Sequence, residues 1–128
     1  AATIGISNFK HIDKIVGKHQ SNANFYDEEL KDVKGVTLLE RKDNHESSFW
    51  IYSMLVDHKD EFMKHMKECG IMVSQVHERN DIHSCVKEYS THLPSLDWIT
   101  PRLISIPVGW WVSEKDRRYI VDCIKKGW

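Results

Sequence analysis

The longest apolar run of the chain, FWIYSMLV at positions 49–56, has the length and the residue types of a β-strand, and we predict the strand at 49–57. The next segment, 58–70, places Phe62, Met66 and Cys69 at i, i+4 and i+7, the spacing of one buried helix face. A strand that leads directly into an amphipathic helix predicts a fold in which helices pack on a sheet. With 128 residues, the chain has the length of one domain with a single hydrophobic core.

The rest of the chain continues this alternation of helices and strands. Residues 2–33 carry apolar side chains near the 3.6-residue period, which predicts one long helix that ends before Gly35. The other predicted elements are a short strand at 36–40, a polar turn at 41–48, a strand at 71–77, a helical segment at 84–102 interrupted at Pro94, an extended segment at 103–109, and a final helix capped by Ser113 with Asp116. We therefore predict the α+β class: a two-layer sandwich with a small, mainly antiparallel sheet, helices on one face, and a long N-terminal linker helix.

Charge and composition exclude several classes of function. The net charge of -1 lacks the basic excess of a general nucleic-acid-binding protein. No apolar run approaches the roughly 20 residues of a membrane-spanning helix, and the N-terminal sequence AATIGISNFK does not resemble a signal peptide. The three cysteines are widely spaced and odd in number, which predicts reduced thiols and a cytoplasmic protein.

The segment SQVHERNDIHSC at 74–85 is the part of the chain richest in chemically active side chains. One interpretation is a zinc site formed by His77, His83 and Cys85, to which Asp81 could add an oxygen, but no pair of ligands at the usual zinc spacing anchors it. A second is a cysteine–histidine nucleophile, which sequence spacing alone does not establish. A third is a site for a phosphorylated or hydroxyl-rich ligand, and a fourth is a polar surface loop. From the residues alone the surface loop is favoured; the candidate ligand-binding residues are His77, Arg79, Asn80, His83 and Ser84.

Three stretches together resemble the DegT/StrS-type aminotransferases. They are AATIGISNFKHIDKIVGKHQSNANFYDEELKDVKGVTL at the start, SSFWIYSMLVDHKDEFMKHMKECGI in the middle and LISIPVGWWVSEKDRRYIVDCI at the end. The resemblance covers essentially the whole chain, and the three motifs occur in the family's order. It implies a pyridoxal-phosphate (PLP) enzyme of the aspartate aminotransferase fold, with active sites shared across a homodimer. The implied reaction is amination of a keto-sugar carried on a nucleotide diphosphate, for glycan or antibiotic-sugar synthesis.

The resemblance also implies how this chain relates to such an enzyme. Residues 1–33 correspond to the linker helix and 34–128 to the small domain, so we expect the PLP-binding large domain and its Schiff-base lysine to lie outside this chain. We therefore expect no catalytic residue, no metal and no bound PLP here, and no transaminase activity from the chain alone. The small domain forms one wall of the substrate site, where His83 matches the family's histidine. His77, Arg79 and Asn80 replace the usual Tyr-Pro region, which leaves the sugar unidentified.

Other functions remain open at this point. The chain could be a stand-alone module that binds sugar nucleotides or another protein without catalysis. Some members of the family dehydrate their substrate instead of aminating it, and the residue that decides this lies in the large domain. Trp110 and Trp111 could stack on a ligand, but packing against another domain is the favoured interpretation. If the large domain is missing, these tryptophans and the apolar face of the first helix are uncovered, and we expect self-association into a homo-oligomer.

Overall fold

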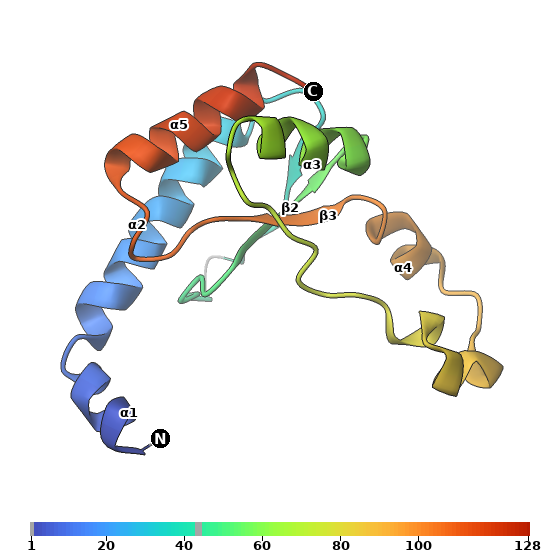
Figure 1. Ribbon diagram of the computed structural model, residues 1–128, viewed down its shortest axis with the longest axis horizontal. Helices are drawn as coiled ribbons and strands as arrows, with labels where there is room; N and C mark the ends of the chain where they lie inside the picture. Colours follow the sequence, from blue (N-terminus) through green and yellow to red (C-terminus); the bar gives the residue numbers. More distant parts are fainter. Residues whose placement is uncertain (1, 43–44) are drawn as a thin grey trace.

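The computed structural model describes residues 2–42 and 45–128, and it confirms the α+β class. The elements are α1 (Ala2–Phe9), α2 (Ile12–Leu30), β1 (Val36–Leu38), β2 (Tyr52–Val56), α3 (Lys59–Glu68), two short 3-10 helices η1 (Asn80–Ile82) and η2 (Ser84–Tyr89), α4 (Pro94–Ile99), β3 (Leu103–Ile106) and α5 (Glu114–Lys125). Figure 1 shows a central body from which two arms project, one ending in α1 and the other carrying α4.

The three strands form one antiparallel sheet in the order β1-β2-β3. Alternate residues of the central strand, Tyr52, Met54 and Val56, are almost fully buried in the core. Because side chains alternate across a strand, these three lie on the same face of the sheet. The same core contains side chains from α2, α3 and α5, among them Tyr26, Leu30, Phe62, Met66, Ile120 and Ile124. The sheet therefore carries its helices on one face, as predicted.

Helix α2 is fastened to the segment that follows β3 by two buried side chains. The Asn22 amide nitrogen lies 3.1 Å from the carbonyl oxygen of Val108, 3.2 Å from that of Gly109 and 3.3 Å from that of Val112. One turn further along α2, the Tyr26 hydroxyl donates to the Pro107 carbonyl oxygen at 2.8 Å, and both side chains have no exposed surface. These bonds give buried backbone carbonyls of the segment after β3 side-chain partners, so they fix the direction in which α2 leaves the body.

The C-terminal residue closes the opposite end of the core. The Trp128 indole donates to the Asp57 carbonyl oxygen at 2.8 Å. It packs edge-on against the Phe62 ring, with 4.9 Å between the ring centroids. Gly35 has a φ of 82° and lies against this indole, where an added Cβ would stand 3.2 Å from Trp128 Cζ2. Glycine is thus required at position 35 both for its left-handed backbone and for its small size.

Two predictions about secondary structure are wrong. The predicted strand at 71–77 makes a single bridge, between Ser74 and Ser105. Met72 is 86% exposed and Val76 40% exposed, so the segment has little apolar burial to hold it against β3 as a strand. The predicted single helix at 2–33 is interrupted before Ile12, where His11 has non-helical dihedrals and its N–H donates back to the Asn8 carbonyl. Helix α1 buries none of its residues, so no packing energy holds it in line with α2.

The remaining elements are confirmed with shorter bounds. Strand β2 begins only at Tyr52, because Phe49 adopts a φ of 48° that bends the chain and turns Trp50 outward. Pro94 starts α4 as its first residue and does not interrupt a longer helix. The capping box predicted from Ser113 and Asp116 is present at the start of α5. The predicted polar turn at 41–48 includes residues 43–44, which lie outside the described residues.

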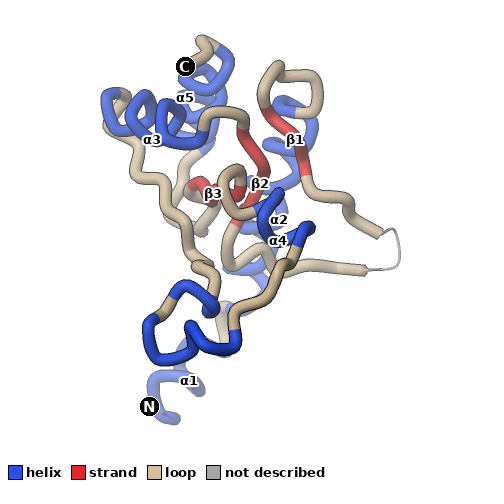
Figure 2. The backbone as a smooth tube through the Cα atoms, turned by 90° about the vertical axis from the view of Figure 1, so that its right-hand side faces the viewer, coloured by secondary structure: helices blue, strands red, loops and turns tan. Residues whose placement is uncertain are grey.

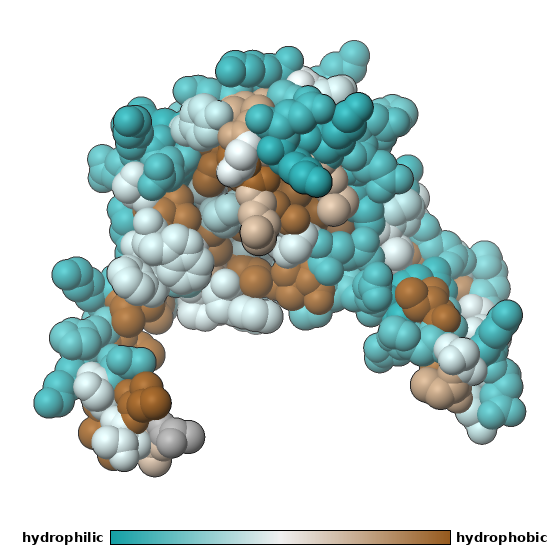
Figure 3. Space-filling model, in the orientation of Figure 1, coloured by the Kyte–Doolittle hydropathy of each residue, from teal (hydrophilic) through white to brown (hydrophobic). Residues whose placement is uncertain are grey.

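Large apolar side chains are exposed on the N-terminal arm and beside its base. Ile4, Ile6 and Phe9 of α1 keep 67 to 71% of their surface exposed, and Trp110 and Trp111 keep 57% and 66%. These are the groups expected to be uncovered in the absence of a further domain. Hydrophobic colour on this arm and on the front of the central body is visible in Figure 3. Within the described residues, none of the helices is long and apolar enough to cross a membrane.

Candidate functional site

The candidate site lies on the second arm, residues 76–99, which leaves the body after α3. Gly70, with a φ of 73°, ends that helix, and Ile71 buries its side chain while its N–H donates to the Met66 carbonyl oxygen at 2.8 Å. The chain then runs along the free edge of β3, where Ser74 and Ser105 exchange two backbone hydrogen bonds of 3.1 and 2.9 Å. After this bridge the chain leaves the sheet and enters the 76–99 arm, which Figure 2 shows below the strands.

One lysine holds the two ends of the arm together. The Lys59 ammonium group donates to the Gln75 side-chain oxygen at 2.7 Å and to the Thr100 carbonyl oxygen at 2.8 Å. Gln75 immediately precedes the 76–99 arm and Thr100 immediately follows it. The first turn of α3 therefore closes the base of the arm, because both bonds come from the same side chain.

A second cluster, centred on Arg79, closes the arm further out. The Arg79 guanidinium donates to both carboxylate oxygens of Asp81, at 2.7 and 2.5 Å, and to the carboxylate of Asp97 in α4. The His92 imidazole Nδ1 lies 3.2 Å from the second Asp97 oxygen. A bidentate guanidinium–carboxylate pair is a directional interaction, so the Arg79 cluster fixes η1 against α4. The cluster consists of Arg79, Asp81, His92 and Asp97.

The ion pairs of the Arg79 cluster shift the pKa values of its charged members. Hydrogen bonds to Arg79 lower the pKa of the Asp81 and Asp97 carboxyl groups, and bonds to both carboxylates raise the pKa of the Arg79 guanidinium. One guanidinium between two carboxylates gives these three side chains one net negative charge. An anionic ligand at Arg79 would therefore have to displace a carboxylate that belongs to the chain itself.

The other four predicted site residues are exposed side chains near the start of the arm. Asn80 begins η1 and Ser84 begins η2, and the His83 N–H donates to the Asn80 carbonyl oxygen at 3.3 Å between them. Asn80, His83 and Ser84 are thus brought into two consecutive turns beside Arg79. His77 lies earlier, where its ring meets the exposed Trp50 indole at 6.4 Å between centroids.

Several residues of the site were not identified from the sequence. Asp97 lies 18 positions from Arg79 and beyond Pro94, and the spacing gives no sign that the two meet. Lys59 and Trp50 come from α3 and from the segment before β2. One feature of the sequence could have pointed to a partner such as Asp97. Arg79 is the only arginine between residues 42 and 101, and a buried or half-buried arginine needs carboxylates near it.

The structure gives no support to a metal centre in this segment. Among residues 2–42 and 45–128, no three histidine, cysteine or acidic side chains are arranged to hold a metal ion. Cys85 is exposed at the start of η2, and Cys69 and Cys123 lie in the body of the protein.

The comparison with family models places the chain in a known family. Residues 1–125 match the model of the DegT/DnrJ/EryC1/StrS aminotransferase family. A curated relative, the erythromycin biosynthesis sensory transduction protein EryC1 of Saccharopolyspora erythraea, is 22% identical over 123 residues, which cover 92% of this chain and 33% of that protein.

Solved structures agree with this assignment. The sugar aminotransferase CalS13 from Micromonospora echinospora is 45% identical with a TM-score of 0.95, over 98% of this chain and 34% of that one. AtS13 from Actinomadura melliaura is 44% identical with a TM-score of 0.96, over 99% of this chain and 34% of its own. The chain thus spans about a third of the length of the relatives that it matches. It belongs to the DegT/DnrJ/EryC1/StrS aminotransferase family.

Proposed function

We propose that this chain is the small domain of a PLP-dependent sugar aminotransferase, with residues 1–33 as its linker to the large domain and 34–128 as the small domain. Its role is to form one wall of the site for a nucleotide-linked keto-sugar. The observation that carries this proposal is the 45% identity to the sugar aminotransferase CalS13 over nearly the whole chain. In this proposal the reaction itself, amination and not dehydration, depends on residues of the large domain.

The contact surface for the substrate is proposed to be the outer part of the 76–99 arm. His83, Asn80 and Ser84 are exposed in consecutive turns, so their polar atoms are available to sugar hydroxyl and phosphate oxygens. In this proposal Arg79 does not bind the charge of the substrate directly, because Asp81 and Asp97 already accept hydrogen bonds from both sides of its guanidinium. It positions the turns that carry the three exposed side chains.

The chemistry of the reaction is proposed to come from PLP held by the large domain. A structural relative from Streptococcus pneumoniae, 16% identical with a TM-score of 0.87, is solved in its PMP form. Within this chain, Lys59 does not fit the role of a Schiff-base lysine, because its ammonium group is held by two acceptors in the base of the arm. We assign no step of the amination to residues of this chain and expect it to have no transaminase activity alone.

The proposed partners are the large domain and a second copy of the enzyme, in the cytoplasm. The surface that supports this is the one formed by α1, the start of α2 and Trp110, where a hollow is lined by His11, Ile15 and the Trp110 indole. Burial of an exposed apolar surface of this kind against another molecule is favourable, so the chain alone is expected to self-associate into a homo-oligomer. Sedimentation would contradict this part of the proposal if the protein stayed monomeric across micromolar concentrations.

The test of the proposed site is an NMR titration of the chain with a nucleotide-diphosphate sugar. We expect weak binding, because half of the site is absent, with shifted amide signals confined to 77–84. His83→Ala should reduce these shifts, whereas His11→Ala, which alters an exposed histidine on the opposite arm, should leave them unchanged. Tight, saturable binding would favour a stand-alone binding module, and shifts confined to other segments would reject the proposed wall.

A further inference from the structure

An exposed tryptophan lies beside the start of the 76–99 arm. Trp50 keeps 68% of its surface exposed. Its indole lies next to the imidazole of His77, with 6.4 Å between the ring centroids and 69° between the ring planes. This is an edge-to-face arrangement, which leaves at least one face of each ring free of the other. A flat aromatic surface therefore adjoins the polar turns of the candidate site.

Trp50 is turned outward by a strained corner of the backbone at Phe49. The φ of Phe49 is 48°, in the left-handed region that a bulky side chain rarely adopts. The Phe49 ring is nevertheless buried, with 8% of its surface exposed, and the Arg41 guanidinium lies over it at 4.6 Å from the ring centroid. A residue in such a conformation persists only where the contacts around it outweigh the cost of the strain.

Helix α2 supplies hydrogen bonds that hold this corner in place. His19 Nδ1 donates to the Phe49 carbonyl oxygen at 2.7 Å. The Gln20 side chain donates to the Ser47 carbonyl oxygen at 3.1 Å, and the Ser47 hydroxyl accepts from the Phe49 N–H at 3.1 Å. Hydrogen bonds on both sides of the strained residue fix the direction in which Trp50 leaves the backbone. Supported strain of this kind is found at ligand sites, where it positions a functional side chain.

We propose that the Trp50 indole, with His77 beside it, is the platform on which the nucleobase of the substrate stacks. This assignment depends on the proposed function, in which the ligand is a nucleotide-linked sugar. The turns at 80–84 present polar groups that suit hydroxyl and phosphate oxygens, whereas the base is the flat aromatic part of such a ligand. Stacking on an aromatic side chain uses the face of the base and not its hydrogen-bonding edge, so the platform should accept pyrimidines and purines alike.

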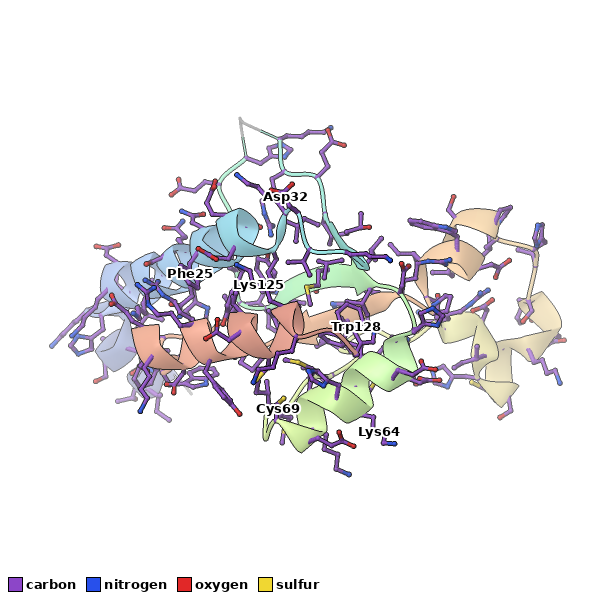
Figure 4. All side chains as sticks on the ribbon, turned by 90° about the horizontal axis from the view of Figure 1, so that it is seen from above. Phe25, Asp32, Lys64, Cys69, Lys125 and Trp128 are labelled. Atoms are coloured by element: carbon purple, nitrogen blue, oxygen red, sulfur yellow. The ribbon has the colours of Figure 1, made fainter. Side chains whose placement is uncertain are left out.

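The experiment is a titration of the chain, followed by NMR of its five tryptophan indole N–H signals. The ligands are uridine diphosphate, guanosine diphosphate and glucose 1-phosphate. Both nucleoside diphosphates should shift the Trp50 signal, and glucose 1-phosphate, which has no base, should leave it in place. The Trp128 indole lies over α3 in Figure 4 and donates to the Asp57 carbonyl oxygen, so its signal is the internal reference.

Substitutions test whether the indole contributes to binding. Trp50→Ala should weaken the binding of both diphosphates by about 5- to 100-fold, the range that stacking of one base provides. Trp50→Tyr keeps an aromatic ring and should restore most of the affinity. Trp98→Ala removes another exposed tryptophan, 54% exposed in α4, and should bind the diphosphates like the wild type. Circular dichroism and an unchanged Trp128 signal establish that each variant is folded.

Three results would overturn the platform, and they separate it from the proposed function. Diphosphates that shift the amide signals of 77–84 without moving the Trp50 indole would leave the proposed substrate wall in place and reject the platform. Glucose 1-phosphate that moves the indole as far as the diphosphates do would reject recognition of the base, because the sugar would then be the stacked ring. No shift with any of the three ligands would reject the wall and the platform together.

Discussion

The buried amide of Asn22 gives the sharpest prediction about the stability of this fold. Its side-chain nitrogen carries two hydrogens and faces three backbone carbonyls after β3, at 3.1, 3.2 and 3.3 Å. Asn22→Ala removes both donors and leaves at least two carbonyls without these partners in a site that has no exposed surface. Each such group costs about 1–3 kcal/mol, so we expect the free energy of unfolding to fall by about 2–4 kcal/mol.

Asn24 provides a matched control on the same helix. It is exposed, so Asn24→Ala changes the same side chain without removing a buried hydrogen bond. Alanine is the better helix former, and the control should therefore be neutral or more stable by roughly 0.5 kcal/mol. Both substitutions share this gain in helix propensity. The difference between their free energies of unfolding therefore measures the contribution of the buried Asn22 hydrogen bonds.

The assay is equilibrium unfolding in urea, followed by circular dichroism and by tryptophan fluorescence. For a protein of this size an expected slope of about 1–3 kcal/mol per molar urea converts the loss into a midpoint lower by on the order of 1–2 M. A midpoint for Asn22→Ala that equals that of Asn24→Ala would refute the reasoning. It would mean that the chain after β3 finds other partners, or that α2 does not depend on this anchor.

Three further predictions concern single interactions. Tyr26→Phe removes the hydroxyl that anchors the next turn of α2 and should lower the free energy of unfolding in urea by about 1–2 kcal/mol. Ser113→Ala removes the capping box of α5 and should cost about 1 kcal/mol in the same assay, with an unchanged fold by circular dichroism. Hydrogen bonds to Arg79 lower the pKa of Asp81 and Asp97, so their contribution is complete above the unfolded-state pKa of about 4 and is lost as the pH falls through the folded-state values. Hydrogen exchange of the 76–99 arm should therefore accelerate in acid before that of the core, and arm and core amides that lose protection together would contradict this.

The sequence predicted those parts of the fold that depend on local chemistry. The i, i+4, i+7 spacing of Phe62, Met66 and Cys69 identified α3, and Ser113 with Asp116 identified the start of α5, because both signals lie within a few residues. The strand at 71–77 was predicted wrongly for a physical reason. Its residues have the composition of a strand, but β3 offers them only one bridge at Ser74, and the apolar Met72 remains 86% exposed.

The sequence draws attention to the segment 74–85 but does not predict the contacts within it. Polar composition drew attention to 74–85, but the roles of its members depend on residues far away in the sequence. The sequence predicts that Arg79 binds a ligand, and in the structure Asp81 and Asp97 of α4 accept hydrogen bonds from its guanidinium. Lys59 was not considered at all, because only the folded chain brings Gln75 and Thr100 to the same ammonium group.

The family assignment rests on residues 1–125, while the chain spans about a third of the relatives that it matches. The measurement that tests the proposed function most directly is the sequence of the source DNA upstream of the codon for Ala1. We predict that the reading frame continues into a large domain with a lysine placed to form a Schiff base with PLP. A start codon immediately before Ala1 would contradict the proposal, and the 76–99 arm would then have to act as a binding surface without an enzyme around it.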